Sequence, residues 1–479
     1  MRVGAGKAVL LARRHWLFLA VMAAAVLVRV LVEIPFWPAL IYIGDSFGYL
    51  KEAIQNEWGQ TQPNGYPAIL ALLFLPGREL GTITIVQHLA GLAVGTLTYA
   101  TLLRLGVNRY VAALPTALVL LDSFAVVLEQ HILTETFFAL ELMAGVFLTV
   151  TGTGRRRTAA AGLLFAAAAV TRVVGLVAVP VWLAYVAAKT RAARTFALAA
   201  VVAVTPLAAY AGIHAAAHRG FRFTEWNGWI LYGRVAHFAD CRGVSLTPAE
   251  RRVCETPAQR RLHVGWTPSE YIFRSDSPAW AAYGPSSRDP RVNSILLGFA
   301  LRMILAHPGA YAHDVLVDYS RYFRPGSFGQ DPAVFLHEQY EPDLSRYTAD
   351  PVMRRYFPGF TLRFGGPLYA AVWYSRHLRP PRLLYAFLAL AILAAFVLGL
   401  SRRARARLPH WLEMTFLGAL AFVLSFVAVA TTEFNLRFFI PVVPLLACSA
   451  TLALWELGVA VAKRRRSSVE SAETAARLG

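Results

Sequence analysis

Long apolar runs separated by polar loops dominate the pattern of hydrophobic and polar positions along this chain. A helix needs about 20 apolar residues to cross the hydrocarbon core of a bilayer. Runs of that kind cover residues 17–34, 82–103, 110–128, 132–150, 159–188, 196–213, 383–400, 412–430 and 438–461. The run 159–188 is too long for one upright helix, and its interruption at Thr171 and Arg172 predicts two shorter helices. The pattern therefore predicts an all-α polytopic membrane protein with about ten transmembrane helices.

Composition agrees with a membrane protein. Hydrophobic residues make up 57% of the 479 positions and charged residues 16%, with a mean hydropathy of +0.47. This balance excludes an ordinary soluble chain. The formal net charge of +19 could indicate a nucleic-acid partner, but the basic residues fall in short loops between the apolar runs. We therefore expect membrane lipids as partners and no nucleic acid.

Basic residues gather in every second loop, which determines the expected orientation in the membrane. The clusters lie near residues 2–14, 104–109, 155–157, 189–194, 402–407 and 463–466. Because Lys and Arg near span ends favour the cytoplasmic side, we expect these loops and both termini to be cytoplasmic. No small-residue cleavage site follows the first run, so it predicts a retained span rather than a signal peptide. The preference for Arg and Ala indicates a bacterial source and hence a bacterial cytoplasmic membrane.

The same alternation places the long polar segments outside and predicts four units. Residues 1–215 form an N-terminal transmembrane module whose first external loop, 35–81, contains an interfacial helix. Residues 216–382 form a mixed extracytoplasmic domain, 383–462 the C-terminal transmembrane helices, and 463–479 a cytoplasmic tail. The amphipathic run 293–306 could pack inside the outer domain or lie on the membrane surface. Cys241 and Cys254 either form a disulfide in this domain or are free thiols.

Known cofactor and nucleotide motifs do not occur in the sequence. There is no CxxC pair, no HExxH, no Walker loop and no GxGxxG signature. Zinc, nucleoside triphosphate and nicotinamide chemistry therefore have no positive support, and no cofactor is certain. A divalent cation at a site of another composition stays open.

Two acidic residues stand out on the predicted outer face. Asp45 begins the segment DSFGYLKEAIQNEW, whose apolar and polar positions predict a short amphipathic helix at the interface. An Asp at such a position ordinarily caps the helix, and catalysis is the alternative. Glu135 lies about one turn inside an apolar run, where an unpaired carboxylate is costly. It either makes a buried hydrogen bond to another span or acts in catalysis.

Two arginines on the same face carry the complementary charge. Arg172 interrupts one apolar run near its outer end, and Arg437 begins the last run in TTEFNLRFFIPVVPLL. The guanidinium fork donates in pairs and stays charged, which suits a phosphate, while snorkelling to lipid headgroups is the alternative. Further polar residues on this face are expected to bind substrate, namely Tyr49, Asn64, Tyr66, His131 and Glu433.

The order of these features resembles the GT-C glycosyltransferases, in the branch of the protein mannosyltransferases and the aminoarabinose transferase. The resemblance rests on the first-loop Asp, the GYP turn, the acid in LTETFF, the break in TRVVGLVAVP and the late RFFIPVVP segment. It covers roughly residues 15–215 and 383–460 but not the outer domain. Members of this family are integral membrane enzymes that use polyprenyl-phosphate sugars.

The resemblance implies a transferase that moves a sugar from a polyprenyl-phosphate donor to a glycan, lipid or protein acceptor. It implies that Asp45 is the general base, that Glu135 matches the second acid, and that Arg437 serves the donor phosphate. An inverting transfer needs one base for the acceptor hydroxyl and cations for the leaving phosphate. Ser46 stands where the branch often has a second acid, which weakens a metal-binding role for this pair.

Two other functions are consistent with the sequence. A transporter or flippase for a lipid-linked molecule would also need acids and arginines within the membrane, although no internal repeat is visible. A non-catalytic assembly factor on the same scaffold is the third interpretation. For a transferase, both hexoses and pentoses stay open as the sugar.

Overall fold

The computed structural model describes residues 12–42, 44–59, 61–218, 220–284, 289–326, 350–362 and 365–478, with side chains up to residue 463. Helices form the regular secondary structure in these ranges, apart from an isolated parallel bridge between Leu40 and His131. The predicted all-α class is therefore confirmed. The described part of residues 216–382 is helical, so the mixed character expected for this segment is not found there.

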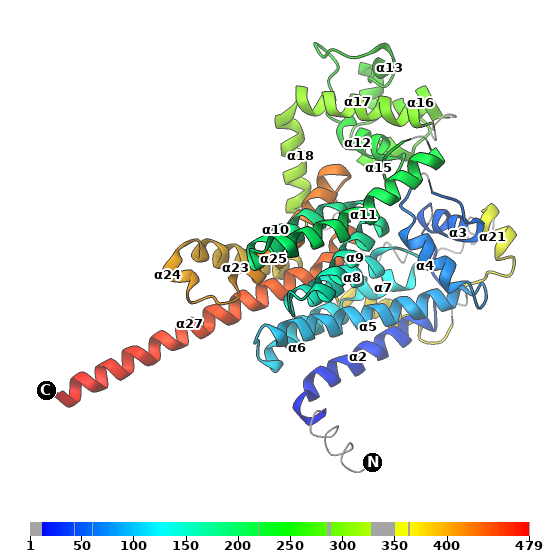
Figure 1. Ribbon diagram of the computed structural model, residues 1–479. Helices are drawn as coiled ribbons and strands as arrows, with labels where there is room; N and C mark the ends of the chain where they lie inside the picture. Colours follow the sequence, from blue (N-terminus) through cyan, green and yellow to red (C-terminus); the bar gives the residue numbers. More distant parts are fainter. Residues whose placement is uncertain are drawn as a thin grey trace.

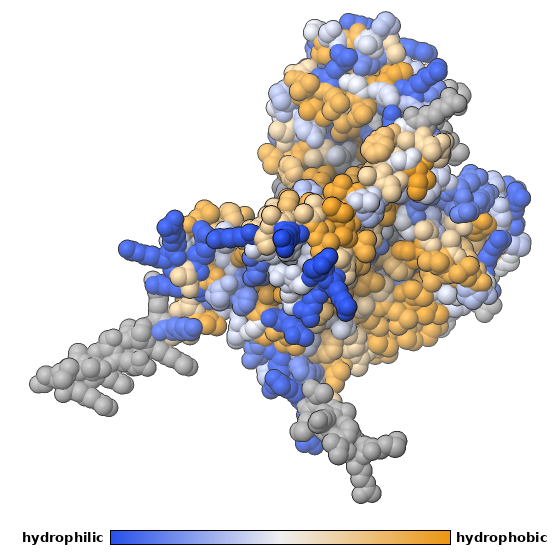
Figure 2. Space-filling view, in the orientation of Figure 1, coloured by the Kyte–Doolittle hydropathy of each residue, from blue (hydrophilic) through white to orange (hydrophobic). Residues whose placement is uncertain are grey.

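A helical bundle and two helices of the first external loop account for most of the chain. They are α2 (Trp16–Glu33), α3 (Asp45–Gln55), α4 (Gly65–Leu73), α5 (Leu80–Arg104), α6 (Arg109–Leu120), α7 (Ser123–Gln130), α8 (Glu135–Val150), α9 (Arg155–Thr171), η1 (Val173–Val177), α10 (Ala178–Thr190), α11 (Ala193–His218), α23 (Arg382–Leu400), α24 (Arg402–Arg405), α25 (Trp411–Thr431), α26 (Leu436–Phe439), η3 (Ile440–Val442) and α27 (Val443–Leu478). Their inward faces share one hydrophobic core, and apolar residues such as Leu27 and Leu89 stay exposed. Figure 2 shows a broad apolar surface along α2 and α5, which suits contact with lipid.

Seven helices in the described ranges are long and apolar enough to cross a membrane, or nine if each of two bent pairs counts as one span. One pair, α6 with α7, bends by 49° and covers the predicted run 110–128; the other, α17 (Pro290–Ala306) with α18 (Pro308–Ser320), lies in the outer segment. α8 and α9 have only 16 and 17 residues, which rise about 25 Å. Each predicted apolar run is helical, but the count of about ten spans is not confirmed.

The predicted break at Arg172 is confirmed and has a local cause. Arg172 has extended backbone angles, φ −145° and ψ 130°, between the end of α9 and the start of η1. Gly175 lets η1 fold back on α9, because a Cβ there would lie 2.6 Å from the carbonyl oxygen of Ala168. Gly65 likewise lets α4 approach the same end of α9, since its Cβ would lie 2.5 Å from the carbonyl oxygen of Val170. The NGYP turn therefore lies against the break at Arg172.

The outer segment folds around a core of its own. Its helices are α12 (Asn227–Ala236), α13 (Pro248–Arg251), α14 (Pro257–Leu262), α15 (Pro268–Phe273), α16 (Pro278–Tyr283), α17 and α18, with α21 (Pro351–Tyr356) and α22 (Leu368–His377) leading back to the bundle. Trp229, Tyr232 and Phe299 are buried together where α12 packs on α17. One face of the amphipathic run 293–306 therefore belongs to this core, and contact of the run with a membrane surface stays a prediction. A disulfide joins Cys241 to Cys254.

Figure 1 shows the outer segment above the bundle, with α18 leading from α17 back to α25. The start of α2 and the end of α27 lie on the side of the bundle that faces away from the outer segment. The basic cluster near residues 2–14 lies mostly outside the described residues. The membrane side that each end faces, and the division of the chain after residues 215, 382 and 462, stay predictions.

Candidate functional site

Asp45 begins α3 at a point where the chain is attached to the link between α7 and α8. The Oγ of Ser46 donates to the carbonyl oxygen of Ile132 at 2.8 Å and accepts from the backbone N–H of Tyr42 at 2.9 Å. The backbone of Leu40 makes two further hydrogen bonds to this link. Ser46, the residue that departs from the family pattern, therefore holds the first turn of α3 in place.

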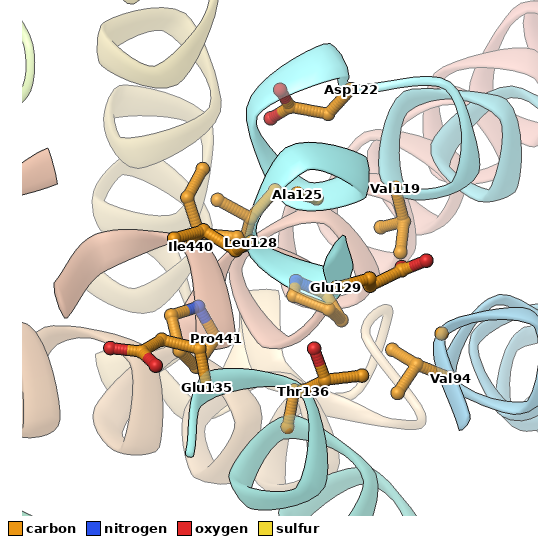
Figure 3. A pocket seen from close by; sticks show the side chains of 14 residues that line it. Val94, Val119, Asp122, Ala125, Leu128, Glu129, Glu135, Thr136, Ile440 and Pro441 are labelled. Atoms are coloured by element: carbon orange, nitrogen blue, oxygen red, sulfur yellow. The ribbon is translucent and has the colours of Figure 1, made fainter. Parts of the chain in front are cut away.

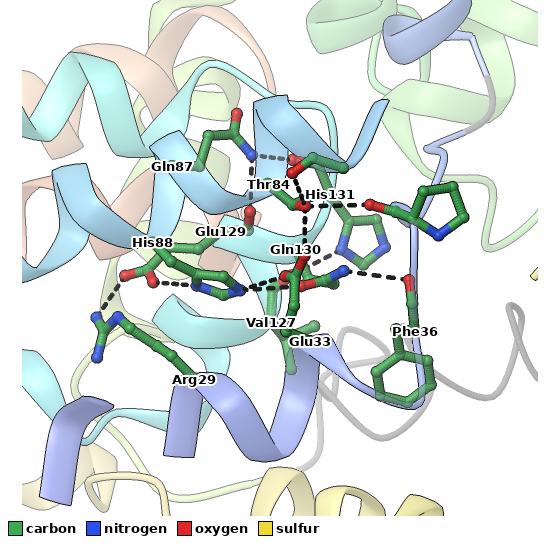
Figure 4. Close-up of polar contacts among 12 residues, drawn as sticks. Arg29, Glu33, Phe36, Thr84, Gln87, His88, Val127, Glu129, Gln130 and His131 are labelled. Atoms are coloured by element: carbon green, nitrogen blue, oxygen red, sulfur yellow. Dashed lines mark hydrogen bonds and ion pairs between the residues drawn. The ribbon is translucent and has the colours of Figure 1, made fainter. Parts of the chain in front are cut away.

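Glu135 begins α8 at the other end of the same link, which Gln87 of α5 holds. The Nε2 of Gln87 donates to the carbonyl oxygens of Glu129 and His131, at 2.7 Å each (Figure 4). Its Oε1 accepts from the hydroxyl of Tyr66 at 2.7 Å. Gln87 is fully buried. One buried amide therefore connects α4, α5 and the link that precedes Glu135.

Four charged side chains meet between α3, α8, the break after α9 and α26. Nη2 of Arg437 donates to Oδ2 of Asp45 at 2.7 Å, and its Nε forms an ion pair with Glu135. Arg172 forms an ion pair with the same oxygen of Glu135 and donates to Oγ1 of Thr134 at 3.1 Å. Both arginines therefore point to interior acids and not to lipid headgroups. Asp45, Glu135, Arg172 and Arg437 are called the charged cluster below.

The charged cluster is buried unevenly. The side chain of Glu135 is 2% exposed and that of Arg437 is 7% exposed, whereas that of Asp45 is 30% exposed. Two carboxylates face two guanidinium groups, so the formal charges cancel and burial becomes tolerable. The ring of Tyr42 covers the guanidinium of Arg437 at 4.8 Å. Asp45 is therefore the more exposed acid of the cluster.

Asp45 does not cap its helix. Gly44 occupies the N-cap position of α3, and the two oxygens of Asp45 accept from Arg437 and from Nε2 of Gln62, the latter at 2.8 Å. The capping interpretation is therefore wrong. Gln62 comes from the loop between α3 and α4, and sequence reasoning missed it because nothing distinguishes it from an exposed loop residue in QTQPNGYP.

Three of the residues expected to bind substrate support α3 and α4. Tyr49 packs edge-to-face on Tyr66 with 5.0 Å between ring centroids. Burial, reinforced for Tyr49 by the charge of Asp45, raises the pKa of both phenols. Oδ1 of Asn64 accepts from the backbone N–H of Gly59 at 3.0 Å. These contacts hold α3 and α4 together with the loop between them, and substrate binding by these residues stays a prediction.

The other two expected substrate residues, His131 and Glu433, also have structural partners. His131 is fully buried in the α7–α8 link, with Nδ1 2.8 Å from the carbonyl oxygen of Val127. Glu433 lies between α25 and α26 and accepts from the backbone N–H of Ser269 at 3.2 Å and from the hydroxyl of the same residue. Glu433 is therefore in contact with the outer segment.

A second buried polar network lies beside the link, and sequence reasoning did not single it out. Arg29 pairs with Glu129 at 2.7 Å, and His88 lies 2.8 Å from Glu129 and 3.1 Å from Glu33 (Figure 4). Ionisable residues within apolar runs are costly unless they are paired, so Arg29 and His88 were a usable signal. Because Glu129 lies in the last turn of α7, the network supports the segment that leads to Glu135.

A cavity lies beside Glu135 and is bounded by α5, α6, α7, α8, η3 and α27 (Figure 3). Its lining is mostly apolar and also contains the acids Asp122, Glu129 and Glu135. The apolar lining residues include Val94, Val119, Ala125, Leu128, Ala139 and Ile440. Among the residues that the structure describes, no group of three or more potential metal ligands occurs. A divalent cation therefore stays an untested expectation.

Residues 81–191 match the family model for dolichyl-phosphate-mannose-protein mannosyltransferase. This match confirms the predicted resemblance. The matched segment is under a quarter of the chain; it contains Glu135 and Arg172, whereas Asp45 and Arg437 lie outside it. No curated protein sequence matches the chain significantly.

Three solved structures resemble the chain at low identity. The oligosaccharyltransferase of Archaeoglobus fulgidus, tethered with an acceptor peptide, shares 15% identity at a TM-score of 0.42, over 92% of this chain and 50% of that one. The oligosaccharyltransferase AglB of the same organism, in complex with an inhibitory peptide and a dolichol-phosphate, shares 14% at 0.43, over 96% and 52%. ArnT from Cupriavidus metallidurans, bound to undecaprenyl phosphate, shares 14% at 0.36, over 92% and 77%. The chain spans about half the length of the first two.

Proposed function

We propose that this chain is a membrane glycosyltransferase that moves a sugar from a polyprenyl-phosphate donor to an extracytoplasmic acceptor, with inversion at the anomeric carbon. The charged cluster carries the proposal, because it joins an accessible carboxylate to two arginines. The family match over residues 81–191, which includes Glu135 and Arg172, supports the same activity. The basic loops support an active site on the outer face of a bacterial cytoplasmic membrane.

Asp45 is the general base in this proposal. The oxygen of the acceptor hydroxyl attacks the anomeric carbon while its proton passes to a carboxylate oxygen of Asp45. The bond between the anomeric carbon and the phosphate oxygen breaks, and polyprenyl phosphate leaves with the bonding electrons. Attack and departure on opposite faces of the sugar invert the anomeric centre and need no carboxylate nucleophile. Asp45 afterwards releases the proton to water.

Arg172 and Arg437 stabilise the negative charge on the leaving phosphate. Thr134 and Glu135 both contact Nη1 of Arg172, and in the proposal Nε and Nη2 of that guanidinium bind phosphate oxygens. Glu135 contacts both arginines, so we assign it the role of positioning them rather than of touching the sugar.

The test measures release of polyprenyl phosphate from labelled polyprenyl-phosphate hexoses and pentoses, with a native cell-envelope extract as acceptor. Wild type is compared with Asp45→Asn, which keeps an oxygen for Gln62 but cannot take a proton. Asp240→Asn is the matched control, because Asp240 lies in the outer segment and pairs with Arg242 at 2.8 Å. Thermal melting verifies that each protein is folded.

We expect release by wild type and by Asp240→Asn, and a loss of about 100-fold or more for Asp45→Asn. Equal release by Asp45→Asn would show that Asp45 is not the base. Movement of an intact lipid-linked sugar across vesicles, with no release of polyprenyl phosphate, would favour a transporter or flippase instead.

A further inference from the structure

The loop between α25 and α26 is attached to the outer segment through the half-buried carboxylate of Glu433. Both oxygens of Glu433 accept from Ser269 at the start of α15, one from the backbone N–H and the other from the side-chain hydroxyl. The two residues are 164 positions apart in the sequence. Withdrawing a carboxylate from water costs free energy unless hydrogen bonds compensate, and Ser269 supplies two such bonds to the half-buried Glu433 from another part of the chain.

Two tyrosines of the outer segment hold the ends of the same loop. The hydroxyl of Tyr311, in α18, donates to the carbonyl oxygen of Ala430 at 2.9 Å. The hydroxyl of Tyr322, just after α18, donates to the carbonyl oxygen of Asn435 at 2.9 Å. The ring of Tyr322 also stacks on Phe439 of α26 with 4.6 Å between centroids. Together with Ser269, these contacts span residues 430–435.

The attached loop leads directly to the charged cluster. Oδ1 of Asn435 accepts from the backbone N–H of Arg437 at 3.0 Å, which starts α26 and sets the direction of the Arg437 side chain. Arg437 then contacts Asp45 and Glu135. A displacement of the loop would therefore move Arg437 relative to both acids.

The surroundings of Glu433 are those of a carboxylate that holds the loop in place, and not those of a fully solvated surface acid. Burial raises the pKa of Glu433, and the negative charge of Asp318 in α18 adds to this, while Ser269 and Arg234 of α12 oppose it. Arg234 is itself buried and forms an ion pair with Asp318. Charged groups of α12 and α18 therefore influence Glu433 at the tip of the loop.

We propose that Glu433 and Ser269 are positioning residues, through which the outer segment holds Arg437 in the geometry needed to stabilise the leaving phosphate. This inference rests on the proposed transferase function and assigns Glu433 a role different from the substrate contact expected from sequence. The interaction of Arg437 with the leaving phosphate strengthens in the transition state. Loss of the correct position of Arg437 therefore lowers kcat more than it changes the donor KM.

The experiment compares Ser269→Ala, Glu433→Ala, the double variant and Glu433→Gln with wild type. Glu433→Gln keeps a side-chain oxygen that can accept from Ser269, so it tests rescue by a neutral group of the same shape. Ser294→Ala is the matched control, because the Ser294 hydroxyl in α17 donates within its own helix, to Pro290 at 2.9 Å. Turnover gives kcat and the donor KM, and amide hydrogen exchange reports on residues 431–437.

We expect Ser269→Ala and Glu433→Ala each to lower kcat about tenfold, with the donor KM within about twofold of wild type. The double variant should have the same kcat as Glu433→Ala, because each of them removes the same contact between Glu433 and Ser269. Glu433→Gln should recover most of kcat, and Ser294→Ala should match wild type. Hydrogen exchange at residues 431–437 should become faster in Ser269→Ala and Glu433→Ala. It should stay at the wild-type rate in Glu433→Gln and Ser294→Ala.

Two results would overturn the inference, and they differ from failure of the proposed function. If wild type is active and Ser269→Ala and Glu433→Ala both keep kcat within about twofold of wild type, the inference is overturned and the proposed transferase function is unaffected. Unchanged exchange at residues 431–437 overturns the attachment itself, whether or not turnover is seen. A wild type that releases polyprenyl phosphate from no donor overturns the proposed function and, with it, the inference.

Discussion

Replacing Glu135 by Gln should destabilise the protein, because Glu135 is the shared partner of Arg172 and Arg437. The substitution keeps the size of the side chain and an oxygen acceptor but removes the charge. It leaves two guanidinium groups and only Asp45 to balance them. The prediction therefore isolates the electrostatic part of the contact from its packing.

The magnitude follows from the burial of the charged cluster. Removing one partner of a buried ion pair costs about 3–5 kcal/mol. Glu135 is 2% exposed and Arg437 7%, so little solvent replaces the lost charge. Arg437 keeps its contact with Asp45 at 2.7 Å, which offsets part of the loss. We expect a decrease of about 3 kcal/mol in the free energy of unfolding.

The assay is reversible unfolding in mixed detergent micelles, with turnover measured on the same samples. Glu141→Gln is the matched control on α8, because Oε1 of Glu141 accepts a neutral hydrogen bond from Thr171 at 3.0 Å that a Gln can preserve. The double variant Glu135→Gln with Arg172→Met restores the charge balance. It should recover most of the stability while turnover stays low, because a proposed phosphate ligand is missing.

Two outcomes would refute this reasoning. If the free energies of unfolding of Glu135→Gln and Glu141→Gln differ by less than about 0.5 kcal/mol, the buried charge balance does not stabilise the fold. If the double variant recovers both stability and full turnover, Arg172 contributes to neither phosphate binding nor transfer, and Glu135 serves the fold alone.

Two more predictions concern the first external loop and the outer segment. Burial raises the pKa of Glu52 to about 8, so the folded state keeps a proton that the unfolded chain releases, and stability should fall as the pH rises from about 4.5 to 8. Glu52→Gln should remove this slope in melting temperature, and an unchanged slope would contradict the assignment. Cys254→Ser removes the disulfide to Cys241 and should lower the free energy of unfolding of the outer segment by about 3 kcal/mol. The measurement is hydrogen exchange of its buried amides, which should become faster. Exchange equal to wild type would show that the segment does not need the bridge.

The sequence by itself determined the class of the protein and the placement of its helices. Apolar periodicity is a local property, so the runs around α2, α5 and α11 could be located without knowing their partners. The break at Arg172 and the helix that begins at Asp45 were local as well. The count of spans was not, because α8 and α9 are short and their depth depends on the helices around them.

Only the tertiary structure decided which polar groups meet. Arg437 and Asp45 are 392 positions apart, and no local pattern relates them. Gln62 and Ser269 became visible as partners of Asp45 and Glu433 only once the loops were placed. Burial and charge balance depend on contacts between distant segments, whereas helix formation depends on neighbours along the chain. The sequence could therefore name the charged residues of the site, and the fold assigned each of them its partner.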